Sequence, residues 1–360
     1  MKKSLIALAV LAASGAAMAQ SSVTLFGVVD ATYAYGTGST SSKSQLTNSG
    51  YNSSRLGFRG VEDLGGGMSA SFWLEAGMNN DNGMGSSNNT TNQAGGAVAN
   101  GGGLNFNRRS TVSLNGGFGE VRLGRDYTPQ FWNLTVFDPF GTNGVGTTQT
   151  LNSALTLPGS TTLVRASNSI GYFLPGKLGG FYGQAQYYMG ENNSNQVNAA
   201  GTNIKKDGNG LAVRVGYANG PINVAVALSE TKFAAGDFQS INVGGQYDLG
   251  VAKVMAHYSQ DEIDGGADGK GFLIGGLVPM GAGEVRLSYS TYKIDNVAGA
   301  DPRSNKLALG YVHNLSKRTA LYTTVARVTN KNGATQALNQ STTAANRNST
   351  GYDFGIRHSF

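Results

Sequence analysis

The chain has 360 residues, no cysteine, 54 glycines and seven prolines, and its 27 basic and 21 acidic side chains give a formal net charge of +6. Without cysteine there are no disulfides, and high glycine with low proline and 16 tyrosines argues against a disordered linker and favours tight turns between strands. The small charge surplus, with no Lys/Arg run, gives no indication of a nucleic-acid partner.

The first nineteen residues form a separate element. Two lysines precede a short apolar run over residues 5–11, and Ala-Met-Ala at 17–19 is a small-x-small cleavage site. The run is too short to span a membrane, so residues 1–19 are predicted to be a secretory signal peptide. The mature chain is expected to start at Gln20, with 360 − 19 = 341 residues and a formal charge of +4. The protein is therefore expected to be exported.

From residue 22 onward, apolar and polar residues alternate in segment after segment, with the two-residue period of a β-strand. In the first segment Val23, Leu25 and Val29 share one parity, and Thr24 and Asp30 take the other. The same alternation recurs at 55–59, 211–217, 222–229 and 284–289. Each segment therefore has one apolar face and one face of small, polar or charged residues.

The connections between these segments alternate strictly between short turns and longer polar stretches. Seven short turn signals lie at 63–67, 115–119, 175–180, 219–221, 249–250, 279–283 and 315–318. Eight longer stretches lie at 36–52, 79–104, 126–163, 190–209, 232–237, 261–270, 294–302 and 330–350. Fifteen connections join sixteen strands, with every short turn at one end, which is typical of bacterial outer-membrane barrels.

We therefore predict an all-β fold, a sixteen-stranded antiparallel transmembrane β-barrel over residues 20–360. A soluble β-sandwich is the alternative, but the second face is too polar and too small for a packed core. In a bilayer the first and last strands must pair to remove the sheet edge. The last segment, 351–360, alternates as a strand and ends on Phe360. It is expected to close the barrel against the strand starting near Ser22.

Six stretches in this order and spacing resemble a known family: SSVTLFGVVDATY, SSRLGFRGVEDLGGG, FNRRSTVSL, GFGEVRLGRDYTP, DPFG and YDFGIRHSF. From residue 21 to 360 the chain resembles the general porins of Gram-negative bacteria, closest to the betaproteobacterial branch. The resemblance implies an outer-membrane homotrimer that passes small hydrophilic solutes, with the third long loop folded into the pore. Expected partners are lipopolysaccharide, outer-membrane lipids and the barrel-assembly machinery, the last through the C-terminal strand and Phe360 as assembly signal.

The third long segment, residues 126–163, differs from the other long loops because it is rich in aromatic residues. Phe131, Trp132, Phe137 and Phe140 lie in it, whereas the other loops are mostly Asn, Ser, Thr, Gly and Ala. A loop packed against an inner wall buries such side chains and is stabilised by that burial. The alternative is an exposed patch that binds a partner. We predict that this segment is the constriction loop and that these four residues pack it against the wall.

Eight arginines fall on the polar, lumen-facing parity: Arg55, Arg59, Arg109, Arg122, Arg165, Arg214, Arg286 and Arg357. On the lipid face near mid-depth an arginine would cost roughly 2–4 kcal/mol. The predicted pore constriction consists of Arg55, Arg59, Arg109, Arg122, Arg165, Asp126 and Asp138. A narrow bore rich in arginine and poor in acids attracts anions, so a mild anion preference is expected. Alternatively, the arginines pair with Asp30, Glu75 and Asp353 and only brace the wall.

The sequence contains no catalytic signature. There is no HExxH, GxSxG or P-loop motif, and His257 on the lumen parity has no evident serine or acid partner on its own strand face. We predict that the chain is not an enzyme and needs no cofactor or metal, although sequence leaves open a triad assembled from distant strands. Two other functions stay open. A substrate-specific channel would need a row of side chains that bind the solute, and Trp73 and Trp132, the only two tryptophans in the sequence, give little evidence of one. A non-conducting barrel acting as a surface adhesin would need no constriction.

Overall fold

The computed structural model describes residues 22–93, 98–99, 103–149, 160–295 and 299–360. The predicted signal peptide, residues 1–19, lies outside the described residues. Within the described part, no helix combines the length and the apolar character needed to cross a membrane.

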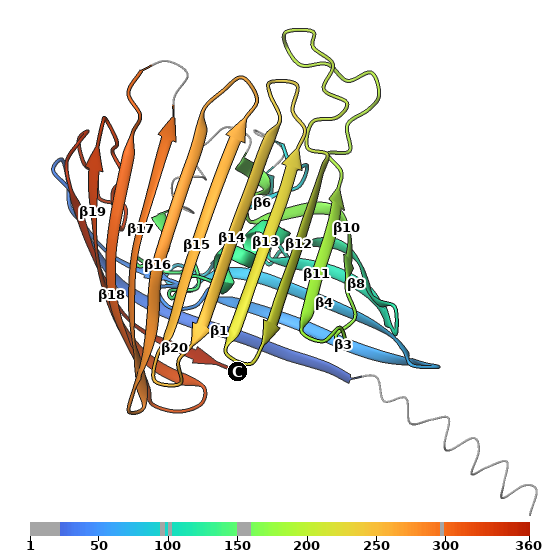
Figure 1. Cartoon of the computed structure of the whole chain (residues 1–360), viewed down its shortest axis with the longest axis horizontal. Helices are drawn as coiled ribbons and strands as arrows, with labels where there is room; N and C mark the ends of the chain where they lie inside the picture. The colour runs from blue at the N-terminus through green and yellow to red at the C-terminus, as the bar shows by residue number, and fades with distance from the viewer. Residues whose placement is uncertain (1–21, 94–97, 100–102, 150–159, 296–298) are drawn as a thin grey trace, which may run out of the picture.

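Sixteen long strands form one closed antiparallel sheet (Figure 1). They are β1 (Ser22–Thr37), β3 (Arg55–Gly65), β4 (Met68–Asn79), β8 (Arg109–Gly116), β9 (Gly119–Tyr127), β10 (Arg165–Phe173), β11 (Phe181–Tyr188), β12 (Gly210–Asn219), β13 (Ile222–Thr231), β14 (Phe238–Asp248), β15 (Lys253–Ile263), β16 (Asp268–Met280), β17 (Gly283–Asp295), β18 (Arg303–Asn314), β19 (Thr319–Lys331) and β20 (Ser349–Ser359). The predicted strand number and the alternation of short turns with longer connections are confirmed.

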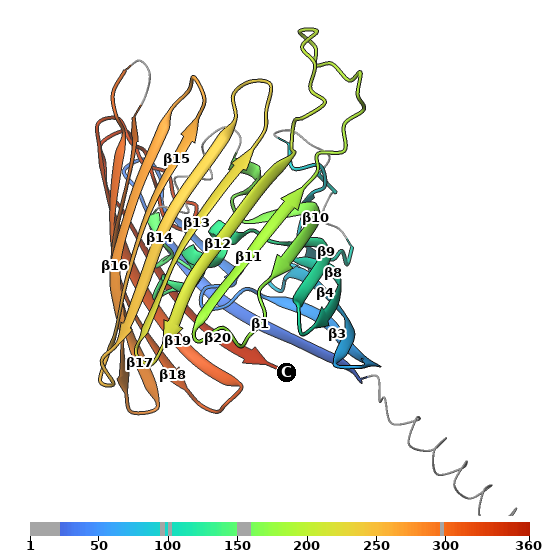
Figure 2. The ribbon, with the colours of Figure 1, turned by 45° about the vertical axis from the view of Figure 1, so that its right-hand side comes forward.

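The remaining elements are short. They are β2 (Lys43–Asn48), β5 (Met84–Gly85), β6 (Asn88–Asn89), β7 (Val98–Ala99), α2 (Pro129–Val136) and the 3-10 helix η1 (Ser160–Thr162). Both helices belong to the connection between β9 and β10. In Figures 1 and 2 the described parts of this connection run inside the ring of strands, and α2 contacts β11, β12, β13 and β14.

The barrel closes as predicted, between its first and last strands. β1 pairs with β20 from Val28 opposite Ser359 to Thr37 opposite Thr350. Beyond that ladder, the backbone N–H and C=O of Phe360 each bond to Gly27 at 3.1 Å. The first and last strands are therefore joined by a continuous ladder, which removes the free sheet edges that a membrane-spanning sheet cannot keep.

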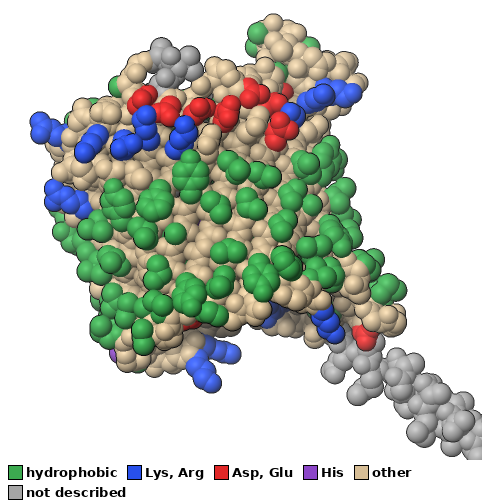
Figure 3. All heavy atoms as spheres, in the orientation of Figure 1, with side chains coloured by type: hydrophobic (Ala, Val, Ile, Leu, Met, Phe, Trp, Pro, Cys, Tyr) green, Lys and Arg blue, Asp and Glu red, His purple; other side chains and the backbone are tan. Residues whose placement is uncertain are grey.

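The two faces of the sheet follow the sequence alternation. On β13, Val224, Val226 and Leu228 are 45%, 40% and 51% exposed, whereas the intervening Ala225 and Ala227 are buried. Figure 3 shows the result as a belt of hydrophobic side chains across the face of the barrel turned to the viewer. An outward apolar band of this kind is the part of such a barrel that contacts lipid hydrocarbon.

An interruption after β2 turns part of the chain inward. β1 pairs with β2 and then with β3, so residues 49–54 between them leave the ladder. We call this segment the inward turn. The Asp30 carboxylate on the inner face accepts the backbone N–H groups of Tyr51 and Asn52 at 2.9 and 2.6 Å. Residues 49–52 belong to the long polar stretch predicted at 36–52, and this turn was not predicted from the sequence.

Candidate functional site

The inner wall between β3 and β10 concentrates basic side chains. Six arginines reach its lumen-facing surface: Arg55 and Arg59 on β3, Arg108 and Arg109 at the start of β8, Arg122 on β9 and Arg165 on β10. The parity rule missed Arg108, because two adjacent residues on a regular strand cannot face the same side. Arg108 directly precedes the strand, and its side chain reaches the inner face through Glu75.

Two buried acids organise part of this wall. Glu75 accepts from Nε of Arg108 at 2.5 Å and lies 3.7 Å from Nε of Arg55. Asp126 lies 2.5 Å from Nη1 of Arg122 and 3.6 Å from Nε of Arg109. These carboxylates hold four arginines in place, with Glu120 as a further partner of Arg122.

Arg59 and Arg165 differ from their neighbours, because neither takes part in an ion pair among the described residues. The Arg59 guanidinium lies over Trp73, 5.2 Å from the ring centroid. The Arg165 guanidinium lies 4.4 Å from the ring of Tyr127 and donates to its hydroxyl at 3.0 Å. Aromatic rings position these two cations without neutralising them. Six arginines therefore face three acids, Glu75, Glu120 and Asp126, a surplus of 6 − 3 = +3 on this wall.

The alternative in which the arginines only brace the wall fits some of these residues. Of the three acids considered for that role, Glu75 does pair with arginines. Asp30 instead holds the inward turn, and Asp353 accepts the backbone N–H of Val145 at 2.6 Å and the Asn339 side chain at 2.9 Å. Bracing therefore accounts for the four arginines that pair with Glu75 or Asp126, but not for Arg59 and Arg165, which lack acid partners.

The connection between β9 and β10, residues 128–164, is called the inner loop. The sequence predicted this loop at residues 126–163. The bounds differ because Asp126 and Tyr127 still belong to β9 and β10 starts only at Arg165. The loop begins with α2, where Pro129 stands at the first helical position, a position that needs no backbone N–H donor. The Asn133 side chain, held by Arg214 of β12, donates to Asn242 of β14 at 3.0 Å.

Glycines on the inner face provide seats for the inner loop. A Cβ atom at Gly244 of β14 would lie only 2.1 Å from Cδ2 of Phe137, and one at Gly275 of β16 would lie 2.8 Å from Cγ of Pro139. Only a residue without a side chain allows so close an approach. The excess glycine was expected to lie in turns, and Gly244 and Gly275 show a second use for it.

The tip of the loop continues along the same wall. A Cβ at Gly310 of β18 would lie 2.9 Å from Cε1 of Phe140, and one at Gly351 of β20 would lie 2.5 Å from Cγ2 of Val145. The seats therefore occur on every second strand from β14 to β20. The loop crosses the half of the barrel that lies opposite the arginine wall.

Three of the four aromatic residues predicted to pack the inner loop against the wall are buried. Phe131, Phe137 and Phe140 are buried. Trp132 is half-buried and packs edge-on against Tyr127, with ring centroids 5.4 Å apart. The aromatic content of this segment thus reflects packing inside the barrel.

Asp138 does not face the solute path, contrary to the expectation. It is 4% exposed, and its carboxylate accepts the backbone N–H groups of Phe140 and Thr148 at 2.8 and 3.0 Å. Burial raises the pKa of this carboxyl above its ordinary value, and these two hydrogen bonds oppose the rise. Asp138 stabilises the turn at the loop tip from within. The loop consequently presents even less acid to the lumen than the sequence suggested.

The inward turn adds a second basic group. The ring of Tyr51 lies between two guanidinium groups, 4.5 Å from Arg286 of β17 and 5.1 Å from Arg357 of β20. Its other neighbour is the ring of Tyr322, with centroids 5.7 Å apart. Sequence parity placed both arginines in the lumen, but their common partner could not be read from the sequence.

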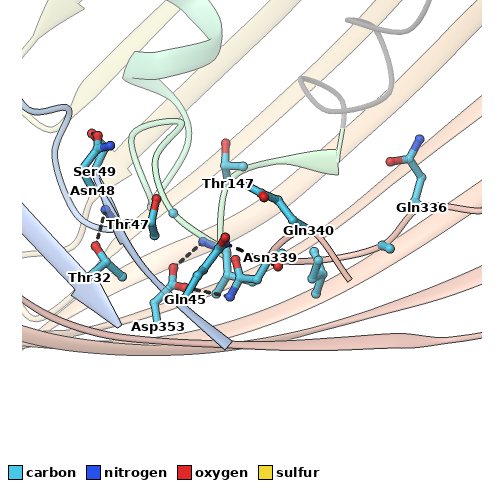
Figure 4. A pocket seen from close by; sticks show the side chains of 15 residues that line it. Thr32, Gln45, Thr47, Asn48, Ser49, Thr147, Gln336, Asn339, Gln340 and Asp353 are labelled. Carbon is cyan, nitrogen blue, oxygen red and sulfur yellow. Dashed lines mark hydrogen bonds between the residues drawn. The ribbon is translucent and has the colours of Figure 1, made fainter. Parts of the chain in front are cut away.

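A largely uncharged cavity of about 450 Å³ lies beside the inward turn, the loop tip and the last long connection (Figure 4). Its lining is rich in amide and hydroxyl side chains: Thr32, Gln45, Thr47, Asn48, Ser49, Thr147, Gln336, Asn339 and Gln340. The one carboxylate among its lining residues, Asp353, is engaged by Val145 and Asn339. This cavity therefore contributes little charge to the lumen.

A closed β-barrel with an apolar outer belt and a charged, polar inner face is a transmembrane channel of the bacterial outer-membrane type. The chain belongs to the Gram-negative porin family, whose sequence profile matches residues 5–333. Members of this family are passive channels, so the chain is a porin and not an enzyme.

Individual relatives agree with this assignment. The chain is 41% identical to outer membrane porin protein 32 of Delftia acidovorans over the whole of both chains. It is 28% identical to an outer membrane porin protein of Bordetella pertussis, over 89% of this chain and 93% of that protein. The solved anion-selective porin from Comamonas acidovorans superposes with a TM-score of 0.81 at 37% identity, over 95% of this chain and 100% of that chain.

Proposed function

We propose that this porin is a general diffusion pore for small hydrophilic solutes, with a mild preference for anions. The observation that carries the proposal is the surplus of positive charge on the arginine wall, opposite a loop whose Asp138 is buried. Similarity to a porin described as anion-selective supports the same direction. The constriction consists of the inner loop on one side and the arginines of β3 to β10 on the other.

The expected selectivity is modest. A univalent ion about 6 Å from one arginine gains or loses about 0.7 kcal/mol in water, and salt at physiological strength leaves roughly half of that. An anion is stabilised and a cation destabilised, so each unneutralised arginine changes the anion-to-cation ratio by about threefold.

The test is a double variant, Arg59→Gln with Arg165→Gln, in planar bilayers under a salt gradient. Both arginines lack acid partners, so their removal leaves no buried carboxylate unpaired. The anion-to-cation permeability ratio should fall by about tenfold, from two threefold steps. Lys317→Gln in the turn between β18 and β19 is the matched control and should leave the ratio unchanged. An unchanged reversal potential in the double variant would show that the arginine wall does not select ions.

The same recordings separate the other functions. Conductance that saturates with one class of solute would identify a substrate-specific channel. A protein that inserts but does not conduct would fit a surface adhesin. A series of neutral sugars of increasing size then gives the exclusion limit of the pore.

Assembly and location complete the proposal. We infer a homotrimer in the outer membrane, delivered after cleavage of residues 1–19 and inserted by the barrel-assembly machinery, which reads the strand that ends on Phe360. Lipopolysaccharide and other outer-membrane lipids contact its apolar belt. The mass of the detergent-solubilised assembly tests the trimer, and an intact mass that starts at Gln20 tests the cleavage.

A further inference from the structure

The cavity beside the inward turn has a composition that the anion preference of the pore does not explain. It is called the amide cavity, and its lining comes from residues within 45–50, 144–147 and 336–340, with Thr32 of β1 and Asp353 of β20. These segments lie far apart in the sequence and meet only in the closed barrel (Figure 4). Its volume of about 450 Å³ lies within the roughly 300–1,000 Å³ that is usual for small-molecule sites. The amide cavity is therefore large enough to hold a small solute.

Several polar atoms of the lining have no partner within the described part of the chain. Thr147 is 9% exposed, and its buried Oγ1 makes no hydrogen bond to any described residue. Gln336 forms hydrogen bonds only through its backbone, and Gln45 uses only Nε2, which donates to the carbonyl of Asn339 at 3.5 Å. The Thr47 hydroxyl, on the inner face of β2, has no described partner either. Buried polar groups without partners are unfavourable, so these atoms offer hydrogen bonds to an occupant.

The charged groups at the amide cavity are already engaged. The Asp353 carboxylate accepts from the backbone of Val145 at 2.6 Å and from the side chain of Asn339 at 2.9 Å. Lys43, which does not line the cavity, donates to the side chain of Gln340, which does. A charged solute would lose hydration here without gaining a free counter-charge, which is costly. The chemistry of the lining therefore favours a neutral occupant that both donates and accepts hydrogen bonds, as amide and hydroxyl groups do.

One part of the lining is aliphatic. Val145 of the loop tip and Leu338 of the last long connection belong to one buried cluster, and both line the cavity together with Ala337. Small-molecule sites commonly combine such apolar surface with a few polar groups that orient the ligand. A sugar ring matches this combination, because its hydroxyl groups lie around the edge and C–H groups cover its faces. The hydroxyl groups reach the amides while one face of the ring lies on the aliphatic side chains.

We propose that the amide cavity is a binding site for a neutral polyhydroxylated solute of the size of a hexose. Its hydroxyl groups bond to Thr47, Thr147 and Gln336, and its ring lies against Leu338. The inference rests on the pore function proposed above and deepens it, because it names a class of solute that is retained inside the pore without any role for charge. Binding is weak, since each hydrogen bond contributes little net free energy and association has its own cost. Bound solute therefore exchanges readily, and diffusion through the pore continues.

The test is a titration of the purified protein with D-glucose, followed by saturation-transfer NMR in a detergent that has no sugar headgroup. Thr47→Val with Gln336→Leu removes two hydrogen-bonding groups at nearly constant shape. One net hydrogen bond changes an affinity by about fivefold, so the double variant should bind glucose about twenty-five-fold more weakly. Gln246→Leu is the matched control, because Gln246 shares the inner face of β14 with Asn242 and does not line the cavity. This control should bind within about twofold of the parent.

Further readouts decide the interpretation. Glucose should bind equally well to the Arg59→Gln, Arg165→Gln variant; weaker binding there would place the sugar on the arginine wall and overturn the assignment. Equal glucose binding by the parent and the cavity double variant would also overturn it, as would tighter binding of protonated glucosamine, which would show that Asp353 selects a cation.

Conductance and reversal potential without sugar should be the same in the cavity double variant and the parent. Failure of this site is therefore distinguishable from failure of the pore function. Gln336→Leu alone, in a connection outside the strand ladder, should weaken glucose binding about fivefold and provides the test should the double variant not fold.

Discussion

Replacing Gly244 by alanine should unseat the inner loop without disturbing the barrel. The new Cβ would lie 2.1 Å from Cδ2 of Phe137, whereas carbon atoms in contact are about 3.5–4.0 Å apart. The ring must therefore move by about 1.5 Å or leave its seat. Phe137 is completely buried there, and exposing such a side chain costs about 1.5–3 kcal/mol. A loss of about 2 kcal/mol raises the unseated population about thirtyfold, since each 1.4 kcal/mol is a factor of ten.

The assay is single-channel recording in planar bilayers. We expect a larger mean conductance and more open-channel noise in Gly244→Ala, because the loop no longer lies flat against β14. Gly245→Ala is the matched control. That glycine faces outward, where the nearest atom to a new Cβ is Cγ1 of Val224 at 3.3 Å. If the two variants gave the same conductance and noise, the glycine seat would not position the loop. Thermal unfolding should be similar in both, since the loop contributes nothing to the strand ladder.

Two other predictions follow from single aromatic residues. Tyr51→Ala should reduce anion selectivity by about threefold or less, because Arg357 loses the ring that positions it in the lumen, whereas Arg286 keeps its ion pair with Glu284. Tyr51→Phe keeps the ring and should retain the parental reversal potential, and equal behaviour of the two variants would contradict the role of the ring. Phe360→Ala should lower the amount of assembled barrel in the membrane, measured as the fraction that resists unfolding in detergent at moderate temperature, because the ring covers Gly27 at the seam. A parental yield would count against that closure role.

The constriction shows how far sequence reasoning reaches. Arg59 and Arg165 were placed in the lumen by parity alone, because neighbouring residues of a strand face opposite sides. Parity could not distinguish them from Arg109, since the acid that pairs with Arg109 is Asp126 on β9 and reaches it only after the strands align. Asp138 was misplaced for a related reason. A loop has no period from which the direction of a side chain can be read, and this carboxylate turned inward to bind backbone N–H groups.

The sequence by itself determined the barrel: the two-residue period, the strict order of short and long connections, and the terminal strand that must pair with the first. Those features are local, and a membrane permits few folds that satisfy every backbone hydrogen bond. Only the tertiary structure decided which charges remain unneutralised, that Gly244 and Gly310 serve as seats for aromatic rings, and that residues 49–54 turn into the lumen. These outcomes depend on contacts between residues far apart in the chain, which form when the sheet closes and which no local pattern records.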